Sequence, residues 1–296
     1  MSLPRGFVIV PIRHQRAPPM PSRKSALSSL LQKLFPYTKK KSAKELQQSN
    51  DPTVSSLALE LLSLIRPMDP VGKSFERIGN EFDGGYVQPV HDTVSKIAYS
   101  LGINRDVSWD MEMAKRGYRL FQYDHTIEKL PARHKHFNWE KKGICGSRTR
   151  QPQMISLEEA ISGNGHGALN DLILKMDIES AEWDVFSEMD QAFLGKFDMI
   201  IGEFHRFHKL TDPAWFAKAK ASLQKLARTH YVVHVHANNA SPFEVHGGVP
   251  LPRLLELTWL RKDLCLFEPA TRIFPTALDA PNIRNRAQHF LGRFSY

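Results

Sequence analysis

One stretch of the chain, Asp171 to Trp183, limits the possible folds more than any other part of the sequence. Residues 172–178 are apolar except for Lys175 and Asp177, a pattern typical of a strand buried on both faces of a parallel sheet. Carboxylates follow where this strand should end, and residues 181–189 then show a helical pattern. A buried strand that leads directly into a helix predicts an α/β fold.

Asp177 and Glu179 mark the carboxyl end of this predicted strand, which is where open α/β sheets bind ligands. Alternation along the strand places both side chains on one side, with Ile178 on the other. Burying two carboxylates there is costly unless a ligand or partner uses them. The alternative is that they only begin the next helix, as an N-cap and a first-turn acid.

Length and composition fit a soluble α/β domain. The chain has 296 residues, of which 42% are hydrophobic, and its two cysteines provide neither a disulfide framework nor zinc-ligand spacing. A reducing compartment is therefore expected. No apolar run approaches the roughly 20 residues of a membrane helix. We expect a cytoplasmic protein, with peripheral membrane contact and organelle targeting left open.

The net charge of +9 is concentrated at one end of the chain. Residues 1–44 contain ten of the 40 lysines and arginines and none of the 31 acidic residues, so the remainder is close to neutral. A nucleic-acid-binding domain would carry its positive charge on the folded surface. Nucleic acid is therefore not an expected partner.

Residues 1–50 are predicted to be a basic, largely disordered segment, because prolines are frequent in residues 1–25 and residues 42–52 are polar. Residues 26–35 have leucines at helical spacing, followed by three lysines. This short amphipathic helix would either dock on the domain or, with residues up to 44, make weak contact with an anionic membrane surface.

The next segments predict the front half of a nucleotide-binding fold. After a helix over 53–65, we expect a strand over 96–101, a turn at Gly102, a helix over 106–116 and a strand over 119–123. Asp124 ends that strand, near the spacing of roughly 20 residues at which a carboxylate binds ribose hydroxyls. With a single glycine in the turn, we expect a cofactor that has a ribose but no phosphates.

Residues 77–87 (RIGNEFDGGYV) predict a loop with Asp83, Gly84 and Gly85 at its turn. The paired glycines are typical of a hairpin turn, or of a place where backbone N–H groups approach a ligand closely. Both interpretations remain open from the sequence.

Further β/α units are predicted after Asp124. They comprise short strand 139–145, helix 156–161 with a capping box at Ser156 and Glu159, strand 197–202, helix 213–228, strand 231–235 and a last strand over 251–261. Polar residues follow three of the strands. These are Asp177 and Glu179; Glu203 and His205; and His234, His236, Asn238 and Asn239. If the strands are parallel neighbours, these groups meet in one crevice beside Asp124.

The motifs in order resemble a known family. RIGNEFDGGYV, SLGINRDVSWD, FQYDHTI, KMDIESAEWDVF, GEFHRF, VVHVHANN and LELTWLRKD are similar to the FkbM-type branch of class I S-adenosylmethionine-dependent methyltransferases, over roughly residues 75–263. The resemblance implies a Rossmann-like class I methyltransferase fold, with a mostly parallel seven-stranded sheet flanked by helices and its last strand antiparallel. It also implies S-adenosylmethionine across the ends of the first strands.

The resemblance assigns the cofactor to the loops of the first strands, with Asp124 on the ribose and residues 101–106 facing the methionine part. The expected cofactor residues are Asp83, Gly84, Gly85, Gly102, Asp106, Asp124 and His125. The family's acidic residue before the glycine turn is absent, because Tyr99 and Ser100 occupy that place, and Asp83 or Asp106 is the expected substitute.

Transfer of a methyl group to a hydroxyl requires removal of a proton, for which His205 and His236 are the candidate bases. Asp177, Glu179 or Glu203 would orient the base, or join it in binding a divalent cation that acidifies the hydroxyl. The mixed ligand set Asp177, Glu203, His205, His236 and Asn238 would suit Mg or Mn. By family analogy, the expected acceptor is a hydroxyl of a sugar, glycan or glycosylated small molecule.

The expected organisation is therefore an N-terminal segment (1–50), a methyltransferase-like domain (51–268) and a C-terminal extension (269–296). Two alternatives remain open: a non-catalytic methyltransferase-like binding module, and a metal-dependent hydrolase. The oligomeric state is not predicted from the sequence.

Overall fold

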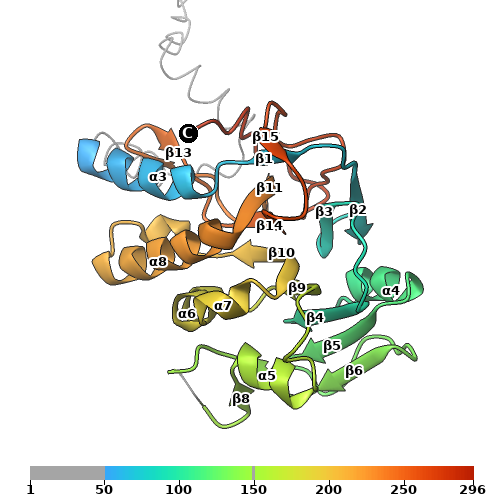
Figure 1. The fold of residues 1–296 in the computed structure, drawn as a ribbon. Coiled ribbons are helices and arrows are strands. Elements are labelled where there is room, and N and C mark those ends of the chain that lie inside the picture. Colours follow the sequence, from blue (N-terminus) through green and yellow to red (C-terminus); the bar gives the residue numbers. More distant parts are fainter. Residues whose placement is uncertain (1–50, 149–150) are drawn as a thin grey trace, which may run out of the picture. The chain divides into compact units, whose positions relative to one another are not determined.

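A seven-stranded sheet organises the computed structural model, which describes residues 51–148 and 151–296. Its strands are β4 (Ile97–Leu101), β5 (Arg119–Tyr123), β6 (Phe137–Glu140), β9 (Leu172–Met176), β10 (Phe197–Phe204), β11 (His230–Ala237) and β14 (Leu255–Arg261). Across the sheet they follow the order β11-β14-β10-β9-β4-β5-β6 (Figure 1). Only β14 is antiparallel to its neighbours in this sheet, and the predicted α/β fold with a mostly parallel sheet is confirmed.

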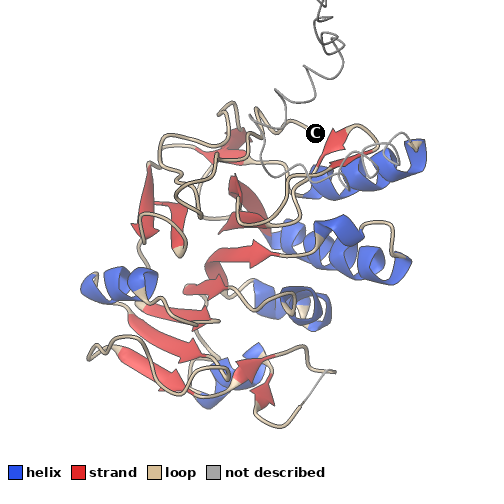
Figure 2. Ribbon diagram, turned by 180° about the vertical axis from the view of Figure 1, so that it is seen from behind, coloured by secondary structure: helices blue, strands red, loops and turns tan. Residues whose placement is uncertain are grey.

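The described helices are distributed unequally over the sheet. They are α3 (Pro52–Leu64), α4 (Ser108–Lys115), α5 (Leu157–Gly163), α6 (Glu182–Glu188), α7 (Gln191–Leu194) and α8 (Pro213–Thr229), with a short 3-10 turn, η2 (Phe207–Lys209). All but α4 lie on one side (Figures 1 and 2). The other side carries α4 and an antiparallel hairpin of β2 (Phe75–Gly79) and β3 (Gly85–Pro89). We call these two sides the helical face and the α4 face.

Four further short pairings complete the described elements. β1 (Met68–Pro70) pairs with β15 (Phe267–Pro269), β7 (Gly143–Ile144) with β8 (Met154–Ile155), and β12 (Val245–His246) with β13 (Val249–Pro250). An isolated bridge joins Phe274 to Gly292. In the described ranges no helix is both long and apolar enough to cross a membrane.

Most predicted elements are confirmed within a few residues. The strand and helix of the opening stretch are β9 and α6, and the capping box of Ser156 and Glu159 begins α5. The Asp83-Gly84-Gly85 segment is the turn of the β2–β3 hairpin. Several boundaries were wrong: 139–145 splits between β6 and β7, the strands predicted over 197–202 and 231–235 continue to residues 204 and 237, β9 ends at 176, and β14 begins at 255. The segment expected to be disordered or membrane-bound, including the helix over 26–35, lies outside the described residues.

The two faces of the sheet differ along the strands. Alternation assigns Ile200 and Phe204 of β10 to the helical face, where they join one large apolar cluster with residues of α3, α5, α6 and α8. On the α4 face a smaller cluster holds the first residues of the parallel strands, including Ala98, Leu120 and Ile173. Further along the strands that face turns polar, which positions the candidate site.

Residues 269–296 belong to the same compact unit as the sheet. Asp279 accepts a hydrogen bond from the buried His234 of β11 at 2.8 Å. Asn282 is itself buried and donates to Glu256 of β14. The segment predicted as a C-terminal extension thus packs over β11 and β14 on the α4 face.

Candidate functional site

Polar side chains meet on the α4 face at the carboxyl ends of β4, β9 and β10. Lys175, Asp177 and Glu203 follow the apolar residues Ile173 and Ile201 on the same face of their strands. They line a cavity of about 300 Å³ whose walls also include the hairpin turn and the first residues of α4. The lining residues are Asn80, Asp83, Gly84, Tyr86, Gly102, Ile103, Asn104, Arg105, Asp106, Trp109, Asp110, Lys175, Asp177 and Glu203.

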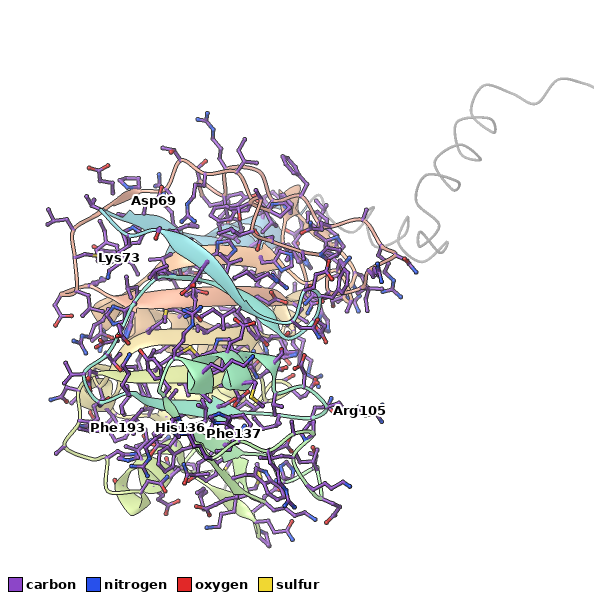
Figure 3. All side chains as sticks on the ribbon, turned by 90° about the vertical axis from the view of Figure 1, so that its right-hand side faces the viewer. Asp69, Lys73, Arg105, His136, Phe137 and Phe193 are labelled. Carbon is purple, nitrogen blue, oxygen red and sulfur yellow. The ribbon has the colours of Figure 1, made fainter. Side chains whose placement is uncertain are left out.

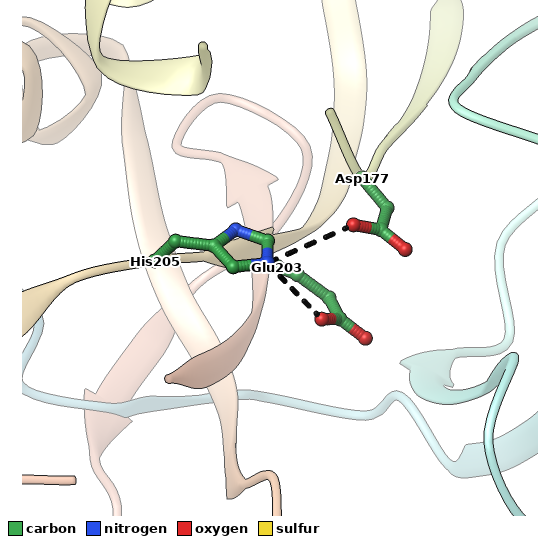
Figure 4. Close-up of side chains that lie close together, drawn as sticks. All are labelled: Asp177, Glu203 and His205. Carbon is green, nitrogen blue, oxygen red and sulfur yellow. Dashed lines mark ion pairs between the residues drawn. The ribbon is translucent and has the colours of Figure 1, made fainter. Parts of the chain in front are cut away.

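Asp177, Glu203 and His205 form a trio at this wall (Figure 4). Nε2 of His205 lies 4.0 Å from Oδ1 of Asp177 and 3.7 Å from Oε2 of Glu203. Octahedral Mg with bonds of about 2.1 Å places neighbouring ligand atoms about 3 Å apart, so shifts of about 1 Å by each carboxylate would let Asp177 and Glu203 hold a cation beside His205. Three of the five predicted metal candidates thus lie together, and a fourth, Asn238, contacts Glu203.

Glu182, in the first turn of α6, orients His205. Its Oε1 lies 3.0 Å from Nδ1 of the imidazole and accepts a hydrogen bond from the backbone N–H of His205 at 2.7 Å. Its Oε2 accepts from the backbone N–H of Ser180. Because Glu182 is fully buried, these contacts hold the ring with Nε2 toward the carboxylates.

The charges at this wall are closely coupled. Burial raises the pKa of Asp177 to about 6, and it raises the pKa of Glu203 well above its usual range, with Asp177 and Glu256 adding to the effect. Burial alone would lower the pKa of His205, but Glu182 and Asp177 outweigh it and the pKa is raised. Carboxylates held this close together favour a cation between them.

A second group of carboxylates shares Glu203. Oxygens of Asp83, Glu203 and Glu256 lie within 4.8 Å of one another. Two side-chain amides lie between these carboxylates. Asn282 donates to Asp83 at 3.0 Å and to Glu256 at 2.5 Å. Asn238 donates to Glu203 at 3.4 Å and to Glu256 at 3.3 Å. These amides reduce the repulsion among the three carboxylates on the side of the site that faces β14.

His236 does not join the trio, because β14 lies between β10 and β11, whereas Asn238 contacts the trio only through its hydrogen bond to Glu203. The predicted crevice assumed that the strands before these residues were neighbours, and this was wrong. His236 is buried, with Nδ1 2.9 Å from Glu256 and Nε2 3.2 Å from Gln288. Oδ1 of Asn238 accepts from the backbone of Ala240. The structure leaves His205 as the histidine beside the cavity, and neither His236 nor Asn238 reaches it.

The prediction that Glu179 extends the strand face beyond Asp177 was wrong, because β9 ends at Met176. Glu179 and Ser180 have left-handed backbone conformations, with φ of 55° and 93°. The Glu179 side chain is 85% exposed, although its Oε2 still lies 3.7 Å from Nε2 of His205. The N-cap of α6 is Ala181, without a side-chain cap, so neither predicted acid serves as its N-cap.

Asp124 organises the turn after β4 and does not line the cavity. Its carboxylate accepts from the backbone N–H groups of Ile103 and Asn104 at 2.8 Å each, and from the backbone and hydroxyl of Thr126. Burial opposes ionisation of Asp124, but these hydrogen bonds outweigh burial and lower its pKa. Its contact with a ribose stays a prediction. The neighbouring predicted cofactor residue, His125, is exposed and likewise outside the cavity lining.

Gly102 and Gly84 are required by close packing. Gly102 has φ of 76°, and a Cβ there would lie 1.6 Å from the carbonyl oxygen of Asp177, so the turn and the trio touch. Gly84 has φ of 82°, and its Cβ would lie 2.5 Å from Oδ2 of Asp106. Both glycines and both predicted acids, Asp83 and Asp106, line the cavity.

Gly85 opens β3 and does not line the cavity. A Cβ there would lie 1.9 Å from the carbonyl oxygen of Asn80, so this glycine serves the hairpin.

A second hollow adjoins the cavity through Asn104 and Arg105. It is lined by Asn104, Arg105 and residues 127–131. Most of its exposed lining is apolar, in contrast to the acidic cavity. Arg105 extends outward from the loop that the two share (Figure 3). The two hollows together suit a ligand with one polar, charged end and one flat, less polar end.

No protein-family model matches this chain, and no curated protein matches it. The function is therefore argued from the residues of the site.

Several site residues were not predicted: Tyr86, Asp110, Glu182, Glu256 and Asn282. Glu256 had a usable signal, because Glu256 and Thr258 alternate with leucine and tryptophan in LELTWLR and so mark a polar face. Glu182 could be assigned from the sequence only as a first-turn acid of a helix. Asn282 comes from a segment without periodicity, and no local pattern places it beside Asp83.

Proposed function

We propose that this protein is an S-adenosylmethionine-dependent O-methyltransferase that binds a divalent cation beside its cofactor. The main observation in support is the Asp177–Glu203–His205 trio, which lies at the wall of a cavity formed by the carboxyl ends of β4, β9 and β10. The sheet has seven strands, and its last strand is antiparallel, as the FkbM-type resemblance implies. The proposed acceptor is a hydroxyl of a sugar, glycan or glycosylated small molecule.

The residues of the site fit this cofactor chemically. When bound, S-adenosylmethionine supplies a methyl group on a positively charged sulfur atom. The cavity wall carries five carboxylates and two basic side chains, which complements a cationic ligand. Oδ2 of Asp110 is a buried acceptor with no partner among the described residues. The neighbouring, more apolar hollow suits a flat base.

In this proposal Asp177 and Glu203 hold the cation, and Nε2 of His205 takes the proton of the acceptor hydroxyl. Mg is commonly held by one or two carboxylates plus substrate oxygens, and it lowers the pKa of a bound hydroxyl. Glu182 keeps Nδ1 occupied, so Nε2 is the nitrogen available to the acceptor. Since the pKa of His205 is raised, we expect activity to rise with pH through values above its ordinary 6.5.

The test is calorimetric titration with S-adenosylmethionine and S-adenosylhomocysteine, with and without Mg or Mn, followed by a screen of sugar acceptors. We expect binding of both nucleosides, with His205→Ala abolishing methyl transfer while affinity for the nucleoside stays within about threefold, because His205 does not line the cavity. Full activity of His205→Ala would reject its role as base. Absence of nucleoside binding under every condition would reject the proposed function.

The metal-dependent hydrolase is the second candidate, because the trio by itself could hold a cation and an activated water. Binding of Mn without binding of either nucleoside would favour it. Binding of neither ligand would favour a non-catalytic module.

A further inference from the structure

A carboxylate oxygen without a partner lies at the floor of the cavity. Asp110 is the third residue of α4 and is fully buried, yet it lines the cavity. Its Oδ1 accepts a hydrogen bond from Nε2 of Gln122 at 2.8 Å. Its Oδ2 has no hydrogen-bond partner among the described residues. A buried, unsatisfied oxygen of this kind is costly in a native protein and calls for a donor.

The neighbours of Asp110 are neutral polar groups and one lysine. Ser100 and Gln122 are directly paired neighbours on β4 and β5, and both are fully buried. The hydroxyl of Ser100 can donate to the carboxylate, as Nε2 of Gln122 does. Lys175, the next residue across the sheet, donates to the carbonyl oxygen of Gly102 at 3.3 Å and acts on Asp110 only through its charge. Among the described residues the direct donors to this carboxylate are therefore neutral.

What the floor of the cavity lacks is a cationic donor in direct contact with Asp110. Burial raises the pKa of Asp110, against the opposing charge of Lys175, so the carboxylate is poorly stabilised without a ligand. Four more carboxylates line the same cavity: Asp83, Asp106, Asp177 and Glu203. A primary ammonium group offers three N–H donors and one positive charge, and a charge-assisted hydrogen bond to a carboxylate is stronger than a neutral one. Asp110 is not part of the Asp177–Glu203–His205 trio, so the proposed ammonium position differs from the proposed cation position.

We propose that Asp110 binds the primary ammonium group of the cavity's ligand, with Ser100 and Gln122 supporting its carboxylate from behind the cavity lining. The ligand's identity rests on the proposed function, in which this group is the amino group of the methionine part of the cofactor. The family's usual acid before the glycine turn is absent, since Tyr99 and Ser100 stand there. A carboxylate from α4 supplies the charge instead.

Three nucleosides test this assignment by calorimetric titration. S-Adenosylhomocysteine has both the amino and the carboxylate group, its decarboxylated analogue has only the amino group, and 5′-methylthioadenosine has neither. Asp110→Asn retains an acceptor for Gln122 but removes the charge. We expect it to weaken the first two ligands by about 10- to 100-fold and to leave methylthioadenosine within about twofold.

Glu112→Gln is the matched control, because it removes one charge from the same helix at a residue that does not line the cavity. It should leave all three affinities unchanged, and thermal unfolding of each variant checks the fold. Equal weakening of all three ligands by Asp110→Asn, or weakening of none, would overturn the ammonium assignment while leaving the methyltransferase proposal in place. A wild-type protein that binds none of the three would overturn both.

Discussion

On β10, Ile200 and Phe204 point to the helical face and Ile201 and Glu203 to the α4 face, although all four residues are buried. The helical face remains apolar to the end of the strand, where Phe204 stacks on Phe186 of α6 with ring centroids 5.8 Å apart. The α4 face changes from apolar to charged within two residues. The same backbone thus supports a continuous core on one side and a site on the other.

This difference separates stability from function in space. The helical face can bury apolar area without interruption, and each buried side chain there stabilises the fold. The α4 face buries carboxylates whose pKa values are raised, which is unfavourable to folding unless a ligand is bound. Substitutions on the two faces should therefore change stability in opposite directions.

The largest expected effect is on the helical face. Phe186→Ala should lower the free energy of unfolding by about 3–5 kcal/mol, because it leaves a cavity beside Phe204 and Trp183 in the apolar cluster. Urea denaturation measures the loss. Ligand affinity, measured where the variant is folded, should be unchanged. A loss below about 1 kcal/mol would contradict the view that this face carries the stability.

A smaller effect of opposite sign is expected on the α4 face. Glu203→Gln should raise the free energy of unfolding in metal-free buffer at pH 8 by about 1–2 kcal/mol, because it removes a buried charge that Asp177, Glu256 and Asp83 repel more than His205 and Lys175 offset. It should also abolish binding of Mn. Destabilisation at pH 8 would show that the carboxylate is satisfied without a cation.

The pH dependence of stability has the same origin. Asp177 and Glu203 have folded-state pKa values above their ordinary 3.8 and 4.5, and that of His205 is also raised, so these three groups bind more protons in the folded protein than in the unfolded one. Their contribution to stability should therefore fall as the pH rises from about 5 to about 8, whereas buried histidines with lowered pKa values, such as His230 and His234, act in the opposite sense. Thermal unfolding across this range, with and without saturating Mg or Mn, isolates the contribution of the trio. A cation should make stability rise more steeply with pH, and an unchanged slope would argue against a cation at the trio.

The smallest expected effect is at the start of α5, also on the helical face. Ser156→Ala removes one half of the capping box with Glu159 and should cost about 1 kcal/mol. The loss should be independent of pH between 5 and 8 and of divalent cations. A loss of stability that changed when a divalent cation was added would contradict the separation of stability and function between the two faces.

The fold was predictable because its signals are local. Apolar strands such as β9, the capping box at Ser156 and the proline at the start of α8 each specify an element within a few residues. The trio was predictable for the same reason, since Asp177, Glu203 and His205 follow strands that are true neighbours.

What failed depends on tertiary pairing. No local pattern shows that β14 inserts between β10 and β11, and this insertion separates His236 from the trio. Packing between elements also decides two sets of partners. It brings Glu182 to Nδ1 of His205, and it brings backbone N–H groups to the carboxylate of Asp124. Strand alternation also ends where the strand ends, which is why the prediction for Glu179 did not hold.

The position of β14 has a consequence for synthesis of the chain. Within the central sheet β11 pairs only with β14, which follows it in sequence, so a nascent chain that has produced residues up to 254 holds β11 without its partner and leaves the edge of β10 bare. Exposed strand edges template pairing between chains. From the appearance of β10 until β14 arrives, the edge of β10 is therefore open to pairing with another chain.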